Sequence, residues 1–162
     1  MLNSGKFMSY LSFFLKNPDA EAEIRGSKDY PEIEGNTYFY QTEKGVIVGT
    51  EISGLPTENN ICKSPVFGFH IHEGDECSGN ATDPFANVMS HYNPHSCPRP
   101  FHSGDLPPLF GNKGYAFSVF LTDRFTVNEI IGKTIIIHSA PDDFTTQPSG
   151  NAGTKIACGI IK

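Results

Sequence analysis

All six histidines of this 162-residue chain lie between residues 70 and 138, so the fold must gather this stretch around whatever those side chains bind. Asp105 lies three residues behind the fifth histidine and adds a carboxylate. Imidazole is the commonest side-chain ligand of transition metals, and a carboxylate is a usual oxygen ligand of zinc. The concentration predicts a metal-binding protein. In chain order the histidines are His70, His72, His91, His95, His102 and His138.

The first two histidines have the two-residue period of a β-strand. His70 and His72 then share one face of the strand, and Ile71 points to the other. His138 ends the apolar run 134–137, so it can reach the same place from across a sheet. Side chains that share a face can converge on one ion, which predicts that these three histidines bind the same metal.

The segment 91–105 carries three histidines and Asp105. Three imidazoles and one carboxylate make a complete tetrahedral zinc set, as in a structural site. The other three histidines remain for a second metal, and a fourth nitrogen would suit Cu(II). One histidine serving both metals would supply it.

The rest of the chain favours an all-β fold, an antiparallel Greek-key barrel or sandwich, with one short helical turn within 123–131. The segments 73–114 and 139–154 are too long for simple connections, and the first holds the metal-binding residues, so both are expected to be functional loops. The expected strands are Ala20–Gly26, Thr37–Gln41, Val46–Ile52, Val66–His72, Tyr115–Leu121, Thr134–His138 and Ile156–Ile161.

Residues 1–19 are interpreted as an extension to a single domain of residues 20–162. Phe7, Leu11 and Phe14 recur at helical spacing and Pro18 ends the pattern, which predicts a short amphipathic helix; a degenerate secretory signal is the alternative. No stretch is long enough to span a membrane.

The formal net charge of −6 argues against nucleic acid and anionic membranes as partners. Without a convincing signal peptide we expect a cytoplasmic protein. Four cysteines favour the alternative, an extracellular or cell-envelope location.

Several motifs follow one another in a fixed order between residues 68 and 159. They are Gly68-Phe69-His70-Ile71-His72-Glu73, His91-Tyr92-Asn93-Pro94, His102-Ser103-Gly104-Asp105-Leu106, Gly132-Lys133-Thr134 ahead of His138, and Gly150-Asn151-Ala152-Gly153 ahead of Ala157-Cys158-Gly159. Together they resemble the copper/zinc superoxide dismutase family over about residues 20 to 162. The stretch 104–109 and the position of Cys77 look like the bacterial branch. The resemblance implies a Greek-key β-barrel that disproportionates superoxide to dioxygen and hydrogen peroxide by copper redox cycling.

The resemblance also implies a role for each metal-site residue. His91 would be the imidazolate that bridges the two metals, and Asp142 would link a copper histidine to a zinc histidine. The implied copper ligands are His70, His72, His91 and His138. The implied zinc ligands are His91, His95, His102 and Asp105.

Two positions depart from the family pattern. Lys155 stands where the family has an arginine that orients superoxide, and lysine lacks the two-pronged donor geometry. The loop 143–149 has no basic residue, so we expect slower catalysis that falls with added salt. The flanks of His95 match the family poorly. The alternative is a solvent-facing histidine, with Cys97 or water completing the zinc site.

The resemblance implies a disulfide between Cys77 and Cys158. Cys62 and Cys97 have no counterpart in the family, and they form either a second bridge or two unrelated thiols.

The leading functional hypothesis is a superoxide dismutase, with a homodimer left open. The first alternative is a copper- or zinc-binding protein of the same fold without dismutase activity. A dinuclear metallohydrolase is a second, disfavoured because the only carboxylate of the set, Asp105, belongs to a closed zinc site.

Overall fold

The computed structural model describes residues 16–57 and 65–162. The predicted N-terminal amphipathic helix and Cys62 lie outside the described residues, so nothing in the structure tests them. Within the described part of the chain no helix is long and apolar enough to cross a membrane.

Most of the chain forms one curled antiparallel sheet, in the strand order β5-β8-β9-β1-β2-β3-β7. A two-stranded sheet of β4 and β6 lies between its two ends: β4 runs directly into β5, and the Asn112–Tyr115 bridge connects β6 to β7. The fold is therefore all-β and antiparallel, as predicted. The strands are β1 (Ala20–Gly26), β2 (Glu34–Thr42), β3 (Gly45–Ser53), β4 (Val66–Phe67), β5 (Phe69–His72), β6 (Leu109–Phe110), β7 (Ala116–Thr122), β8 (Thr134–His138) and β9 (Lys155–Ile160).

The sequence pattern placed most of these elements to within a few residues. β1 and β8 have the predicted bounds, and the expected helical turn is α2 (Val127–Ile130). β6 was not predicted, because two residues carry no periodicity. The predicted strand 66–72 is broken at Gly68, and its halves β4 and β5 pair with different partners.

The hydrophobic core lies inside the curl of the sheet. Alternating residues of β1 and β2, such as Ile24 and Phe39, point inward and are fully buried. Phe69 and Ile71 of β5 join the same core, and burial of each contributes about 1.5–3 kcal/mol. Because alternate side chains of a strand point to opposite faces, His70 and His72 lie on the outer face of β5.

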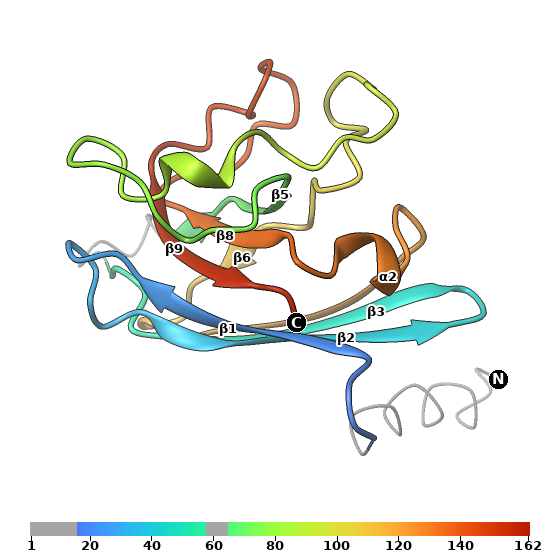
Figure 1. Cartoon of the computed structure of the whole chain (residues 1–162). Helices are drawn as coiled ribbons and strands as arrows, with labels where there is room; N and C mark the ends of the chain where they lie inside the picture. The colour runs from blue at the N-terminus through green and yellow to red at the C-terminus, as the bar shows by residue number, and fades with distance from the viewer. Residues whose placement is uncertain (1–15, 58–64) are drawn as a thin grey trace, which may run out of the picture.

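The two long loops cover the outer face of β5, β8 and β9, on the side away from β1, β2 and β3 (Figure 1). All five residues of β8 are buried, although only one face of the strand can point into the core. Ile136, on the other face, packs with Phe85, Val88 and Cys158 in a second small cluster. The loops therefore create a buried layer outside the barrel.

Candidate metal centre

The outer face of β5 is where the metal-binding side chains gather. His70 and His72 alternate with core residues and are 0% and 3% exposed, because the loops cover them. His138, at the end of the neighbouring strand β8, is also buried. Cross-strand pairing aligns His70 with Ile136 and His72 with Thr134.

Two loop segments lie along β5 like short strands and bring in the remaining side chains. His91 bridges to His72, and Asp105 bridges to His70. The Ile71 N–H donates to the carbonyl of Gly104 at 2.9 Å. A Cβ at Gly104 would lie 2.2 Å from the Ile71 carbonyl oxygen, so this close approach requires glycine.

Four imidazoles converge there and are called here the four-histidine cluster: His70, His72, His91 and His138. One nitrogen of each lies within 4.8 Å of one nitrogen of every other. His70 Nδ1 and His91 Nε2 are buried without a hydrogen-bond partner among the described residues. Four nitrogen donors with buried lone pairs fit copper, which accepts nitrogen ligands in a tetragonal arrangement.

The other nitrogen of three of these rings is held by the protein. His70 Nε2 lies 2.6 Å from Asp142 Oδ2, and His72 Nδ1 lies 2.9 Å from the Met89 carbonyl oxygen. His91 Nδ1 lies 2.9 Å from Asp105 Oδ1. An acceptor at one ring nitrogen places the proton there and leaves the opposite lone pair free for a metal. We therefore assign the proton to the nitrogen that faces the acceptor.

The cluster is held in the neutral form. Burial lowers the pKa of His70 to about 4 and that of His138 to about 3. Burial also lowers the pKa of His72 well below its ordinary value, and the neighbouring His91 and His138 lower it further. Neutral imidazole is the metal-binding form, so the site is prepared for a cation near neutral pH.

These pKa shifts make the stability of the metal-free protein depend on pH. Histidines of the unfolded chain take up protons near pH 6.5, while His70 and His138 resist protonation until about pH 4 and 3. The unfolded state binds more protons in that window. We therefore expect the contribution of these histidines to the free energy of unfolding to be fully present above about pH 6.5 and to be lost as the pH falls. The lowered pKa of His70 alone corresponds to a loss of about 3 kcal/mol in the free energy of unfolding across this range. Thermal melts across this range measure the loss, and a constant melting temperature would contradict it.

A second cluster, defined by His91, His102 and Asp105, shares His91 with the first. All three residues are buried, and their ligand atoms lie within 4.8 Å of one another. Burial alone would raise the pKa of Asp105, but the hydrogen bond from His91 and the charge of Arg99 outweigh it and lower the pKa. The carboxylate is therefore ionised, and two imidazoles and one carboxylate are ligand types that zinc accepts.

His95 is not in the second cluster, although the resemblance implied that it binds zinc. It is exposed in a turn, where the Asn93 side chain accepts from the Cys97 N–H at 3.0 Å and donates to its carbonyl at 2.9 Å. These two bonds close the turn on itself and direct His95 outward. Poor agreement of its flanks with the family was the only sign of this in the sequence.

The residue missed by the sequence analysis is Arg99. Its guanidinium is fully buried between Asp105 and Asp142, with Nη1 2.9 Å from Asp105 Oδ1 and Nη2 donating to Asp142 Oδ2. Nη1 also lies 2.8 Å from His91 Nδ1. Asp142 thus links a histidine of the first cluster to Arg99, where the resemblance implied a link to a zinc histidine. An arginine inside a histidine and aspartate segment was visible in the sequence, but its spacing gave no indication of the contacts.

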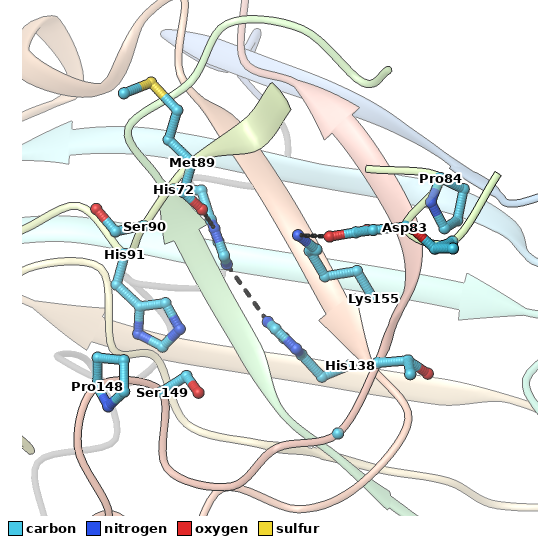
Figure 2. A pocket seen from close by; sticks show the side chains of 13 residues that line it. His72, Asp83, Pro84, Met89, Ser90, His91, His138, Pro148, Ser149 and Lys155 are labelled. Carbon is cyan, nitrogen blue, oxygen red and sulfur yellow. Dashed lines mark hydrogen bonds and ion pairs between the residues drawn. The ribbon is translucent and has the colours of Figure 1, made fainter. Parts of the chain in front are cut away.

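A cavity of about 490 Å³ opens onto the four-histidine cluster. His72, His91 and His138 line it, and Lys155 lies at its wall (Figure 2). The Lys155 ammonium is 2.5 Å from Asp83 Oδ2, so the cation expected to attract an anion already has a carboxylate partner. A small anion can reach the exposed side of the cluster through this cavity.

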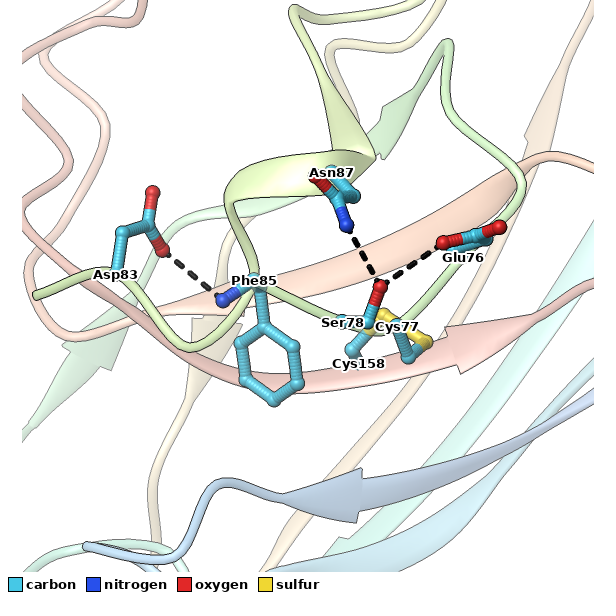
Figure 3. Close-up of a disulfide and its surroundings, with 7 residues drawn as sticks. All are labelled: Glu76, Cys77, Ser78, Asp83, Phe85, Asn87 and Cys158. Atoms are coloured by element: carbon cyan, nitrogen blue, oxygen red, sulfur yellow. Dashed lines mark hydrogen bonds between the residues drawn. A yellow bond between two sulfur atoms is a disulfide. The ribbon is translucent and has the colours of Figure 1, made fainter. Parts of the chain in front are cut away.

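A disulfide ties the cavity wall to the barrel. Cys77 and Cys158 are bonded, with Cα atoms 5.7 Å apart, as the resemblance implied (Figure 3). The loop beyond Cys77 carries Asp83 and Met89, which contact Lys155 and His72. Cys97 is a free thiol, and since its predicted partner Cys62 is outside the described residues, the second bridge stays a prediction.

Comparisons with known proteins agree with this geometry. A family model described as copper/zinc superoxide dismutase matches residues 33–161. The Cu-Zn superoxide dismutase 2 of Aquifex aeolicus is 29% identical over 98% of this chain and 95% of its own length. The Cu-Zn superoxide dismutase 1 of the same organism is 33% identical over 79% of each chain. The crystal structure of a double mutant of a SOD-like protein from Bacillus subtilis superposes with a TM-score of 0.69 at 25% identity, covering 86% of this chain and 95% of that one.

Proposed function

The chain belongs to the copper/zinc superoxide dismutase family, and from this premise we propose that it disproportionates superoxide to dioxygen and hydrogen peroxide. The observation that carries the proposal is the four-histidine cluster beside an open cavity: His70 Nδ1 and His91 Nε2 have no partner among the described residues, and His72 Nε2 lies 3.4 Å from His138 Nε2. Copper held there would supply the one-electron redox chemistry that the reaction needs. We propose that the copper ligands are His70, His72, His91 and His138.

The protein's own residues prepare the site for that chemistry. Asp142 and Asp105 accept hydrogen bonds from His70 and His91, which fixes both rings and directs their free nitrogens into the cluster. The Met89 carbonyl does the same for His72. Because these acceptors are already in place, the cluster needs little rearrangement to bind a metal.

A direct experiment is to load metal-free protein with copper and to measure both copper per chain and superoxide consumption. We expect one copper per chain and rapid dismutation. Copper binding without activity would instead favour the alternative, a metal-binding protein of the same fold that has lost the reaction. Failure to bind copper would contradict the assignment of the ligands.

The ion pair between Lys155 and Asp83 is expected to restrain the rate. With Asp83→Asn we expect kcat/KM to rise about threefold at low ionic strength, because a local cation raises the arrival rate of an anion when no carboxylate neutralises it. Asparagine keeps the side-chain oxygen that accepts from the Phe85 N–H, so the loop is preserved. Lys155→Ala should lower the rate and flatten its salt dependence. Equal rates for both variants and the unmodified protein at all salt concentrations would rule out this steering role.

We also propose a homodimer formed through the exposed face of β7. Phe117, Val119 and Leu121 alternate along this edge strand and are 67%, 44% and 46% exposed. A contiguous apolar stripe on a sheet edge is typical of a contact surface. Sedimentation equilibrium should give twice the chain mass, and Val119→Glu should restore the monomer. A monomer at every concentration tested would refute the dimer.

A further inference from the structure

We infer that the Arg99 guanidinium, rather than a zinc ion, is the resident cation of the second cluster. Arg99 is 5% exposed as a residue and its side chain is fully buried. A buried charge is tolerated only where it is paired and hydrogen-bonded. Here two buried carboxylates accept from both terminal nitrogens, so the charge is paired without any metal and only Nε lacks a partner among the described residues.

The guanidinium acts as a fork between the two carboxylates that orient the histidines. Nη1 donates to Asp105 Oδ1 at 2.9 Å, and Nη2 donates to Asp142 Oδ2. The same Asp142 oxygen accepts from His70, and the same Asp105 oxygen accepts from His91. One planar group thus fixes the carboxylates behind two of the four proposed copper ligands, a geometry that the point charge of lysine cannot reproduce.

Zinc does not fit beside Arg99 in this arrangement. A zinc ion would lie about 2.0–2.2 Å from His91 Nδ1 and from an Asp105 oxygen. Nη1 already lies 2.8 Å from His91 Nδ1 and 2.9 Å from Asp105 Oδ1, and the Nδ1 proton points at that same oxygen, so only Asp105 Oδ2 is left without a partner among the described residues. Ion and guanidinium therefore compete for the same place, and their charges repel.

The donor set is also incomplete for zinc. Structural zinc sites have four protein ligands, and within 16–57 and 65–162 the second cluster offers three. His95, the residue implied as the fourth, is exposed in its own turn. Zinc could enter only by displacing Arg99, which would leave a buried cation without its partners.

The surrounding backbone is shaped to the guanidinium. Gly150 has a φ of +69°, and a Cβ there would lie 2.7 Å from Arg99 Nη2 and 1.9 Å from Asp142 Oδ1. Arg124 Nη1 donates to the carbonyl oxygens of Pro100 and Asp105 at 2.9 and 3.1 Å, which holds the segment after Arg99 in place. Removal of the guanidinium would thus open a space beside His91, Asp105 and Asp142, the residues that it contacts.

Metal content tests the inference directly. Metal-free protein is given copper and zinc in excess, dialysed, and assayed for both metals. We expect one copper and no zinc per chain, and no change in the copper spectrum or melting temperature when zinc is added. Arg99→His supplies a fourth ligand and removes the cation, so we expect it to bind one zinc, with affinity at least about 100-fold above that of the unmodified protein.

A second probe separates ligation from a general role in folding. Co²⁺ added to copper-loaded protein should give visible absorption of tetrahedral cobalt in Arg99→His and none in the unmodified protein or in Arg99→Lys. Tight binding of one zinc per chain by the unmodified protein would overturn the inference, even if Arg99→His fails to fold. The inference rests on the proposed function only for the copper spectrum; zinc content is counted whether or not the protein consumes superoxide.

Discussion

His72→Gln is expected to lower superoxide consumption by at least about 100-fold. His72 donates one of the four proposed copper nitrogens, and even residues that only orient a ligand cost 10–100-fold when removed. Its Nε2 lies 3.4 Å from His138 Nε2 at the floor of the cavity, and its Nδ1 is fixed by the Met89 carbonyl. Glutamine has similar length but no ring nitrogen to offer. Copper per chain should fall together with the rate.

His95→Gln is the matched control for this experiment. It makes the same chemical change at an exposed histidine that lies outside both clusters. We expect unchanged copper content and unchanged activity. If the two variants lost activity equally, the ligand assignment would be wrong; if His95→Gln alone lost activity, His95 would have to join a metal site in solution.

The second large effect concerns the disulfide. Replacing Cys77 and Cys158 together by serine is expected to lower the free energy of unfolding by about 4 kcal/mol, because the bond joins residues 81 positions apart and restricts the unfolded chain. For a chain of this size the melting temperature should fall by roughly 10 °C. Activity should fall as well, since the loop that it anchors carries the Met89 carbonyl and Asp83. Thermal melts and rates measured on the same samples check both.

Cys97→Ser provides the comparison. Cys97 is a free thiol in the structure, so we expect its replacement to change stability by less than about 0.5 kcal/mol. A loss comparable to that of the double variant would instead support the predicted bridge between Cys62 and Cys97. No loss from removing Cys77 and Cys158 would show that the loop is held by packing alone.

Much of the barrel could be predicted because it depends on local pattern. The alternation in β1 and the apolar run of β8 place their core faces without reference to any other strand, and both had the predicted bounds. β6 could not be found in this way. Its two residues become a strand only because β4 lies beside them, so long-range pairing decides their conformation.

In the metal site, too, the residues set by local pattern could be predicted and those set by long-range contacts could not. The period of two fixed His70 and His72 on one face, and the motifs of the resemblance pointed to His91, His102, Asp105 and His138. The three clearest departures involve side chains of the long loops. Arg99, the exposed His95 and the Asp83–Lys155 pair all depend on where those loops turn.

The sequence by itself determined the all-β fold, the shared face of the histidine pair, and the concentration of nitrogen ligands in one stretch. These follow from strand geometry, in which spacing along the chain fixes direction. Only the tertiary structure decided that Arg99 bridges Asp105 and Asp142 and that Lys155 is paired. The physical reason is that a buried charge takes whichever opposite charge the folded loops bring within hydrogen-bonding distance, and 43 residues separate Arg99 from Asp142 in the chain.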